Sequence, residues 1–281
     1  MKSIFATIVM FASLSLLFAQ SENKPQFPEN FSEKAFQKAA PSVVKLIFDN
    51  GETVGSGVIL AVHKDNVGFI LTSYSLIAGR DKVAVILKNY PDALLGYVVE
   101  KFIDFDLGLA VVALKNFPAG QPVITLKELK NPETGKSFST ISHVRNADWS
   151  VFKTTIQGSA PRFFTISSDS ANEIGFGAPL LTKKGEMCGL IVKMEEELNA
   201  DDSVYMKAVN VSAIKPMLDE WFHALPLKQK WHEQGAGIAS WMWAVGGGVL
   251  GGTVAAIVTA GGGSGGDGPA GLPRPPQPPK Q

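Results

Sequence analysis

The chain has a single cysteine among its 281 residues, which excludes an intrachain disulfide and any metal site built from several cysteine ligands. This residue, Cys188, lies in an apolar run, a setting that favours a buried structural thiol over a reactive one. An excess of charge is also missing, because 26 basic residues balance 26 acidic ones. Without a positive excess there is no electrostatic basis for binding nucleic acid, and the sequence predicts neither that partner nor a cofactor or metal.

Charge is absent altogether from residues 235–266, and the stretch 238–260 is long enough to cross a hydrocarbon core of about 30 Å as a helix. Trp241 and Trp243 stand at its outer edge, where indole rings favour the headgroup zone. The sequence therefore predicts one transmembrane helix. It contains two small-xxx-small pairs, Gly247 with Gly251 and Gly248 with Gly252. Such pairs allow two helices to pack closely as a homodimer. The alternative is that glycine is simply frequent in membrane helices.

The N-terminus has the pattern of an export signal. Lys2 precedes an apolar run over residues 4–18, and Ala19 suits the last position before a cleavage site. We expect a Sec signal peptide at 1–19, followed by an N-terminal extension at 20–37. Together with the later span, this signal predicts a protein anchored in the inner (cytoplasmic) membrane, with its globular part in the periplasm or otherwise outside.

The charges that flank the predicted span do not favour this orientation by the positive-inside rule. Lys228 and Lys230 precede the span, and only Arg274 and Lys280 follow it. The tail, 261–281, is rich first in glycine and then in proline, so it cannot bury a core. We expect polyproline II character there and a role as a spacer or as a docking peptide.

Between the two ends, short apolar or alternating segments separated by Gly, Pro, Asn and Asp indicate antiparallel strands. Two helices are expected beside them, at 32–39 and 212–222, and residues 226–237 are expected to form a juxtamembrane linker. The expected strands are 43–48, 54–62, 68–73, 82–87, 94–100, 107–114, 122–126, 137–141, 150–157, 163–166, 179–181, 188–194 and 205–209.

Three segments carry a more specific pattern: Gly68-Phe-Ile-Leu-Thr-Ser-Tyr-Ser-Leu76, Asp104-Phe-Asp-Leu-Gly-Leu-Ala-Val-Val112 and Gly175-Phe-Gly-Ala-Pro-Leu-Leu181. They resemble G-[YF]-[IV]-L-T-N-A-H-V, D-x-x-x-D-L-A-[VL]-L and G-N-S-G-G-P-L, three motifs of the HtrA/DegP-like branch of the trypsin-like serine proteases (chymotrypsin superfamily). Further similar runs keep the family's order, at 41–47, 55–60, 185–192 and 209–218. The resemblance implies an all-β domain at 38–225, with two six-stranded antiparallel β-barrels at about 40–127 and 137–210 and a closing helix at 212–222.

The resemblance also locates the catalytic triad of the family. Its His falls on Ser75, its Asp on Gly108 and its nucleophilic Ser on Phe176, with Asp106 as an alternative position for the aspartate. Phenylalanine has no nucleophile, and an alcohol is not basic enough to replace an imidazole. Because loss of one triad member typically lowers turnover by about 10⁴ to 10⁶, we expect no peptidase activity.

The oxyanion pocket is altered in the same region. The family position two before the nucleophile is usually Gly and here is Ile174, and the second Gly of S-G-G-P is Ala178. A β-branched residue is poorly suited to unusual backbone angles, so we expect this pocket not to form.

Two alternatives to an inactive homologue remain open. In one, an active endopeptidase uses displaced residues, a serine near 176 with His63 or His143; the serines considered are Ser167, Ser168 and Ser170. In the other, the barrels are a stable spacer within an envelope complex, and the glycine-rich span and the tail carry the function.

The leading hypothesis is a regulatory or binding module that holds an extended peptide or an envelope protein. A cleft between two barrels can add a peptide as a further strand through backbone groups, which requires no nucleophile. Phe176 then forms either an apolar knob or a plug. The candidate binding residues, besides Ser75 at the rim, are Ile174, Gly175, Phe176, Gly177, Ala178, Gly189, Leu190 and Ile191.

Overall fold

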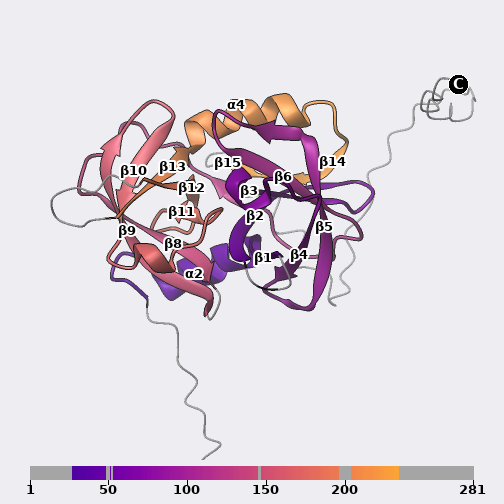
Figure 1. Cartoon of the computed structure of the whole chain (residues 1–281), viewed down its shortest axis with the longest axis horizontal. Coiled ribbons are helices and arrows are strands. Elements are labelled where there is room, and N and C mark those ends of the chain that lie inside the picture. Colours follow the sequence, from indigo (N-terminus) through magenta and orange to yellow (C-terminus); the bar gives the residue numbers. More distant parts are fainter. Residues whose placement is uncertain (1–26, 49–50, 52, 145–146, 196–203, 234–281) are drawn as a thin grey trace, which may run out of the picture. The chain divides into compact units, whose positions relative to one another are not determined.

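The structure is a computed structural model that describes residues 27–48, 51, 53–144, 147–195 and 204–233. All of these belong to one compact unit, 1–238. Strands make up most of the described chain, and the helices are few and short (Figure 1). The predicted signal peptide, the predicted span with its glycine pairs and the proline-rich tail lie outside the described residues.

The first barrel is a closed sheet of six antiparallel strands. Its order is β1-β4-β5-β6-β3-β2, and a further pairing of β1 with β2 closes it. All six residues of β3 are buried, because one face points into the barrel and the other packs against the rest of the domain. The strands are β1 (Val43–Phe48), β2 (Thr53–His63), β3 (Gly68–Ser73), β4 (Lys82–Leu87), β5 (Tyr90–Asp104) and β6 (Leu109–Leu114).

The second barrel repeats this plan. Its order is β11-β8-β9-β10-β13-β12, and the pairing of β11 with β12 closes it. The predicted fold of two six-stranded antiparallel barrels is therefore confirmed for the described chain. The strands are β8 (Ser137–Val144), β9 (Ala147–Ser159), β10 (Phe163–Ser167), β11 (Pro179–Leu181), β12 (Met187–Glu195) and β13 (Tyr205–Asn210).

The expected strand at 107–114 begins two residues later than predicted. Leu107 N–H donates to Asp104 Oδ1 over 2.8 Å, and this bond holds the chain in a turn. Gly108 follows with φ of +67°, a left-handed conformation that ends the turn and that glycine adopts without strain. The family-like Asp104–Val112 segment is thus a turn followed by β6.

The two predicted helices are present, each with a polar N-cap. In α2 (Glu33–Ala39), Ser32 Oγ accepts from Ala35 N–H, and in α4 (Val211–Phe222), Asn210 Oδ1 accepts from Ala213 N–H. Sequence analysis did not predict the short helix α3 (Tyr74–Ile77) or two 3₁₀ turns, η1 (Ala40–Ser42) and η3 (Ala171–Glu173).

The segment expected as a juxtamembrane linker, 226–237, contains strands. β14 (Leu227–Lys230) pairs with β2, and β15 (His232–Glu233) pairs with β7 (Thr125–Leu126), which in turn pairs with β12. Between them, Trp231 is 3% exposed. This part of the chain therefore belongs to the folded domain, because one large indole ring is buried in the core.

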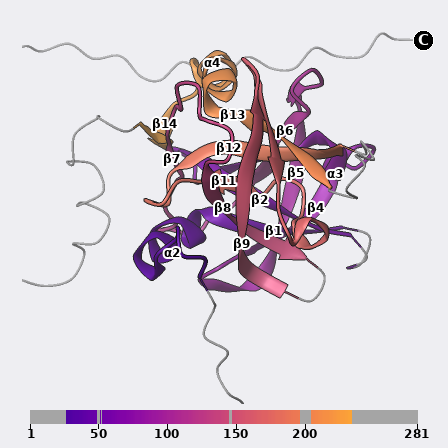
Figure 2. The same ribbon diagram turned by 90° about the vertical axis from the view of Figure 1, so that its left-hand side faces the viewer.

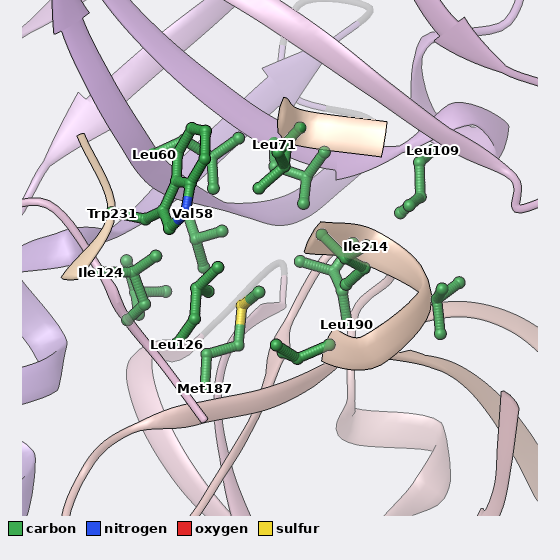
Figure 3. Close-up of a cluster of buried hydrophobic side chains, with 14 of the residues drawn as sticks. Val58, Leu60, Leu71, Leu109, Ile124, Leu126, Met187, Leu190, Ile214 and Trp231 are labelled. Carbon is green, nitrogen blue, oxygen red and sulfur yellow. The ribbon is translucent and has the colours of Figure 1, made fainter. Parts of the chain in front are cut away.

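The main core lies between the barrels. It joins Val58, Leu60 and Leu71 of the first barrel to Met187 and Leu190 of the second (Figure 3). Helix α4 covers one end of this core in both views (Figures 1 and 2) and contributes its buried apolar face: Ile214, Met217, Leu218 and Phe222. Each Å² of apolar surface removed from water stabilises the fold by about 25 cal/mol. Separating the barrels would expose this shared core, so the stabilities of the two barrels are coupled.

No helix within the described residues has the length and apolar character needed to traverse a bilayer.

Candidate functional site

Ser75, at the predicted position of the family histidine, lies in the first turn of α3 directly after β3. Ser73 caps this turn, and the two hydroxyl oxygens are 2.7 Å apart. Both hydroxyls also lie within hydrogen-bonding distance of the Val192 carbonyl oxygen, Ser73 Oγ at 2.9 Å and Ser75 Oγ at 3.3 Å. A carbonyl oxygen has two lone pairs. The two hydroxyls have two hydrogens for three contacts, so one hydroxyl donates to the other and the remaining hydrogen is donated to the Val192 oxygen.

Gly108, at the predicted position of the family aspartate, also lies near Val192. A Cβ added to Gly108 would be 3.8 Å from Val192 Cβ, and the Gly108 carbonyl accepts from Tyr74 N–H over 2.8 Å. Asp106, the alternative position, is exposed. No hydrogen bond in the described structure joins it to Ser75.

Phe176, at the predicted position of the nucleophile, lies in a turn pressed against the first barrel. Its half-buried ring packs on the apolar core of that barrel, and its carbonyl accepts from Ser56 N–H over 2.9 Å. The next residue, Gly177, donates to Ile191 O over 2.7 Å. Its φ is +76°, and an added Cβ would be 1.9 Å from Ser56 O, so only glycine fits.

The three predicted positions therefore lie around one short stretch of β12, Ile191–Val192. Ser75 and Gly108 flank Val192, and the turn that carries Phe176 is bonded to Ile191. The fold brings these positions together as the sequence resemblance implies. None of the three side chains is ionisable near neutral pH.

The two backbone N–H groups that precede Phe176 have internal acceptors. Ile174 N–H donates to Ala171 O over 3.2 Å, and Gly175 N–H donates to Ser142 Oγ over 2.7 Å. Ile174 has φ of −101° and ψ of 113°, ordinary extended values that a β-branched residue adopts readily. An oxyanion needs preorganised N–H groups that point at it, and these two amides point elsewhere.

Ser56 and His143 form a buried pair that sequence analysis did not predict. Ser56 Oγ is 3.1 Å from His143 Nδ1 and also accepts from the His143 backbone N–H over 3.1 Å. Both residues are 0% exposed. Burial, with smaller contributions from the nearby Lys45 and Lys88 ammonium groups, lowers the pKa of His143 to about 3. The imidazole is therefore neutral over the physiological range.

The serines proposed for displaced catalysis have other partners. Ser167 Oγ accepts from Gln157 Nε2 over 2.7 Å, and Ser168 Oγ donates to Lys153 O over 2.6 Å. Ser170 donates its backbone N–H to Ser168 Oγ, and His63 Nδ1 accepts from Asp65 N–H. In the described part of the chain, Ser56 is the serine whose hydroxyl reaches a histidine ring.

Most of the candidate peptide-binding residues are interior. Six of the eight are buried, and Gly175 and Phe176 are partly exposed. The backbone of Ile191 is also taken, because its N–H donates to Ala178 O and its C=O accepts from Gly177. The buried six are Ile174, Gly177, Ala178, Gly189, Leu190 and Ile191. Apolar periodicity identified their strand correctly but did not reveal that the adjacent turn already covers it.

Sequence analysis missed an aromatic pair beside the site. Phe105, in the turn before Gly108, is 71% exposed, and its ring lies 4.9 Å from that of Tyr74 in an edge-on arrangement. The sequence shows a phenylalanine in the Asp104–Val112 segment, but only the structure shows that its ring is exposed and packs edge-on against Tyr74.

A shallow groove of about 500 Å³ adjoins the same turn. It extends toward α4, and Ser75 and Phe176 do not line it. Its walls combine apolar side chains with two acids, Asp104 and Glu220, and one base, Arg162. Together with the exposed Phe105 ring, the groove forms an accessible surface beside the segment that carries Gly108.

Cys188 is buried and its Sγ–H donates to Leu180 O over 3.3 Å. Burial raises the pKa of this thiol, which keeps it protonated and unreactive. The described residues contain no group of three or more His, Cys, Asp or Glu side chains suited to a metal ion.

The described fold is similar to solved serine proteases. A serine endoprotease from Yersinia pestis aligns with a TM-score of 0.56 at 21% identity, over 71% of this chain and 69% of its own. The HtrA-type protease AlgW, solved with a tripeptide, aligns with a TM-score of 0.54 at 22% identity, over 68% of this chain and 64% of its own. At these identities the likeness concerns the fold.

A third neighbour is a protease of M. tuberculosis H37Rv, solved as an inactive mutant. It aligns with a TM-score of 0.53 at 18% identity, over 70% of this chain and 94% of its own. The chain matches no protein-family model and no curated protein sequence.

Proposed function

We propose that this chain is a catalytically inactive homologue of the trypsin-like serine proteases, and that it acts as a membrane-anchored module for binding an extended peptide or protein segment. The observation that carries the proposal is the set of side chains around Val192. Ser75, Gly108 and Phe176 provide no base, no carboxylate and no nucleophile. Acyl transfer by this fold requires all three to act as a unit.

The surroundings of these positions support the same conclusion. The Val192 carbonyl accepts from a serine hydroxyl of the protein, and the Ile174 amide donates to Ala171 O. Restoring a single catalytic side chain would therefore leave the backbone groups near it engaged internally.

The Ser56–His143 pair is unsuited to replace the triad. A general base works best when its pKa is near the operating pH, and the pKa of His143 is about 3. Neither side chain is exposed to a substrate. The two side chains instead contact one another through Ser56 Oγ and His143 Nδ1 between β2 and β8, and His143 Nε2 is buried without a hydrogen-bond partner among the described residues.

We place the peptide on the edge of β12 beyond Val192. Residues 193–195 pair with β13 on one side, and no described strand pairs with them on the other. An extended peptide can add to such an edge through backbone hydrogen bonds, with apolar side chains as anchors. Tyr74 and Phe105 supply those anchors, because Tyr74 precedes Ser75 and Ser75 contacts Val192.

The location is part of the proposal. The export signal at 1–19 and the span at 238–260 support a domain held at the outer side of the inner membrane. A binding module in this place would meet extended segments of exported or envelope proteins.

The test uses the full chain in detergent micelles with a library of fluorescent extended peptides. We expect saturable binding without cleavage. Phe105→Ala should weaken that binding about tenfold, because it removes the exposed aromatic anchor. Leu95→Ala is the matched control, since Leu95 is also large and exposed, at 50%, but lies on another strand segment. Cleavage of bound peptide, or an equal loss in both variants, would contradict the proposal.

A further inference from the structure

Strand β14 carries an exposed row of positive charge. It is the last strand of its sheet and pairs only with β2 within the described structure. Lys228 and Lys230 are both exposed, and Lys228 lies where the register of β14 against β2 shifts, between Leu227 and Gln229. The exposed Lys64 lies beside them, because its backbone N–H donates to Pro226 O over 3.0 Å. We call Lys64, Lys228 and Lys230 the basic edge.

The charge of the basic edge is largely uncompensated. None of its three lysines forms an ion pair with another described residue, and Lys230 Nζ lies 5.8 Å from the ring centroid of Trp231. Residues 61–66 and 226–231 contain three lysines and a single acidic residue, Asp65. These two segments therefore carry an excess of two positive charges.

The length of chain after the described residues fixes where this edge can lie. Glu233 ends β15, and the expected span begins at residue 238. Five residues extend at most about 18 Å, and the headgroup layer occupies roughly 5 to 8 Å of that distance. Lys230 is three residues from Glu233. The basic edge is thus held close to the headgroups, within roughly one or two Debye lengths at 0.1 M salt.

We propose that the basic edge docks on an anionic lipid bilayer, with the three ammonium groups against lipid phosphates. This inference rests on the membrane span of the proposed function. It also accounts for Lys228 and Lys230 on the outer side of that span. They belong to a folded strand that binds the surface, rather than to a flexible flank that sets the orientation.

The test is lysine acetylation of the full chain in nanodiscs, read by mass spectrometry. One set of nanodiscs contains phosphatidylcholine alone, and the other adds phosphatidylglycerol, so that neither lipid carries a reactive amine. We expect anionic nanodiscs to slow acetylation of the basic edge by about fivefold, and 0.5 M salt to abolish the effect. The control lysines, Lys34 on α2 and Lys153 on β9, should react equally in both; Figure 1 shows β9 far from β14.

Lysines on an edge strand can also serve only to prevent that strand from pairing with another chain. A double variant distinguishes this role from docking on the membrane. In Lys228→Gln with Lys230→Gln, Lys64 should lose most of its lipid-dependent protection, while Lys34→Gln with Lys153→Gln leaves it intact. If the basic edge is acetylated equally in both kinds of nanodisc, the inference is overturned, but the proposed membrane span is not. Failure of the chain to insert into any nanodisc overturns the anchor and the inference together.

Discussion

At the residue scale, Gly177 is constrained twice, by its conformation and by its neighbours. Its φ of +76° resembles the +81° of Gly120, but an added Cβ would meet Ser56 O at Gly177 and nothing within 4 Å at Gly120. We expect Gly120→Ala to lower the free energy of unfolding by about 1 kcal/mol, through conformation alone. Gly177→Ala should lower it by about 3 kcal/mol or more, because the turn must leave the first barrel.

Urea unfolding of the two variants measures the difference. If both lost the same free energy, the contact between the Phe176 turn and β2 would not exist as described.

His143 predicts a pH dependence of stability. Burial keeps this imidazole neutral down to about pH 3 in the folded state, whereas in the unfolded chain it takes up a proton near pH 6.5. Protons therefore favour the unfolded state between these values. The free energy of unfolding should fall by up to about 1.4 kcal/mol for each pH unit below 6.5, and the loss should level off near pH 3.

Denaturant titrations at several pH values measure this slope in the wild type and in His143→Gln, which should have a shallower one. His223→Gln serves as the control, because His223 is exposed. A wild-type slope that is unchanged in His143→Gln would show that other groups cause it.

The sequence located Ser75, Gly108 and Phe176 because each lies in a local motif. It could not reveal the Ser56–His143 pair, whose members are 87 residues apart and meet only after both barrels close. The contacts of the Ser73 and Ser75 hydroxyls with Val192 O were hidden for the same reason, with a separation of 119 and 117 residues.

At the element scale, the segment after α4 predicts a large effect from one residue. Trp231 is 3% exposed and lies 5.9 Å from the Phe222 ring, edge to face. Trp231→Ala should lower the free energy of unfolding by about 3 to 5 kcal/mol. Trp231→Phe should lower it less, because the ring is kept and a buried N–H without a partner among the described residues is removed.

Thermal or urea unfolding checks the series, with Lys230→Ala as the exposed control that should change stability by less than about 0.5 kcal/mol. A Trp231→Ala variant as stable as the wild type would mean that this segment is not part of the domain core.

Strand prediction succeeded where apolar residues alternate or run continuously, as in β1, β3 and β4, whose bounds were predicted without error. It failed for β14 and β15. The sequence of β14, Leu-Lys-Gln-Lys, has little apolar signal, and its pairing depends on β2 being in place. Strands of two residues such as β7 are set by their neighbours rather than by their own composition.

At the scale of the whole molecule, the described chain forms two barrels, and most of the candidate binding residues between them are buried. The core is shared between the barrels, the turn at Phe176 bridges them, and the Val192 carbonyl accepts from a serine hydroxyl. A strand edge at residues 193–195 of β12, unpaired within the described chain, and the exposed Phe105 ring lie in the same region as Ser75 and Gly108. The order and spacing of the sequence motifs predicted the two barrels. The contacts that bury the candidate binding residues join segments far apart in the sequence, so the sequence did not predict them.

The most direct test of the central claim asks whether any serine of the folded protein is activated. The full chain is treated with an excess of a fluorophosphonate, beside an active trypsin-like protease as positive control, and its intact mass is measured. The account predicts no covalent adduct, because the fold pairs no serine with a basic, accessible imidazole in its described part. An adduct of one phosphonyl group per chain, mapped to a single serine and lost when that serine is replaced by alanine, would contradict it.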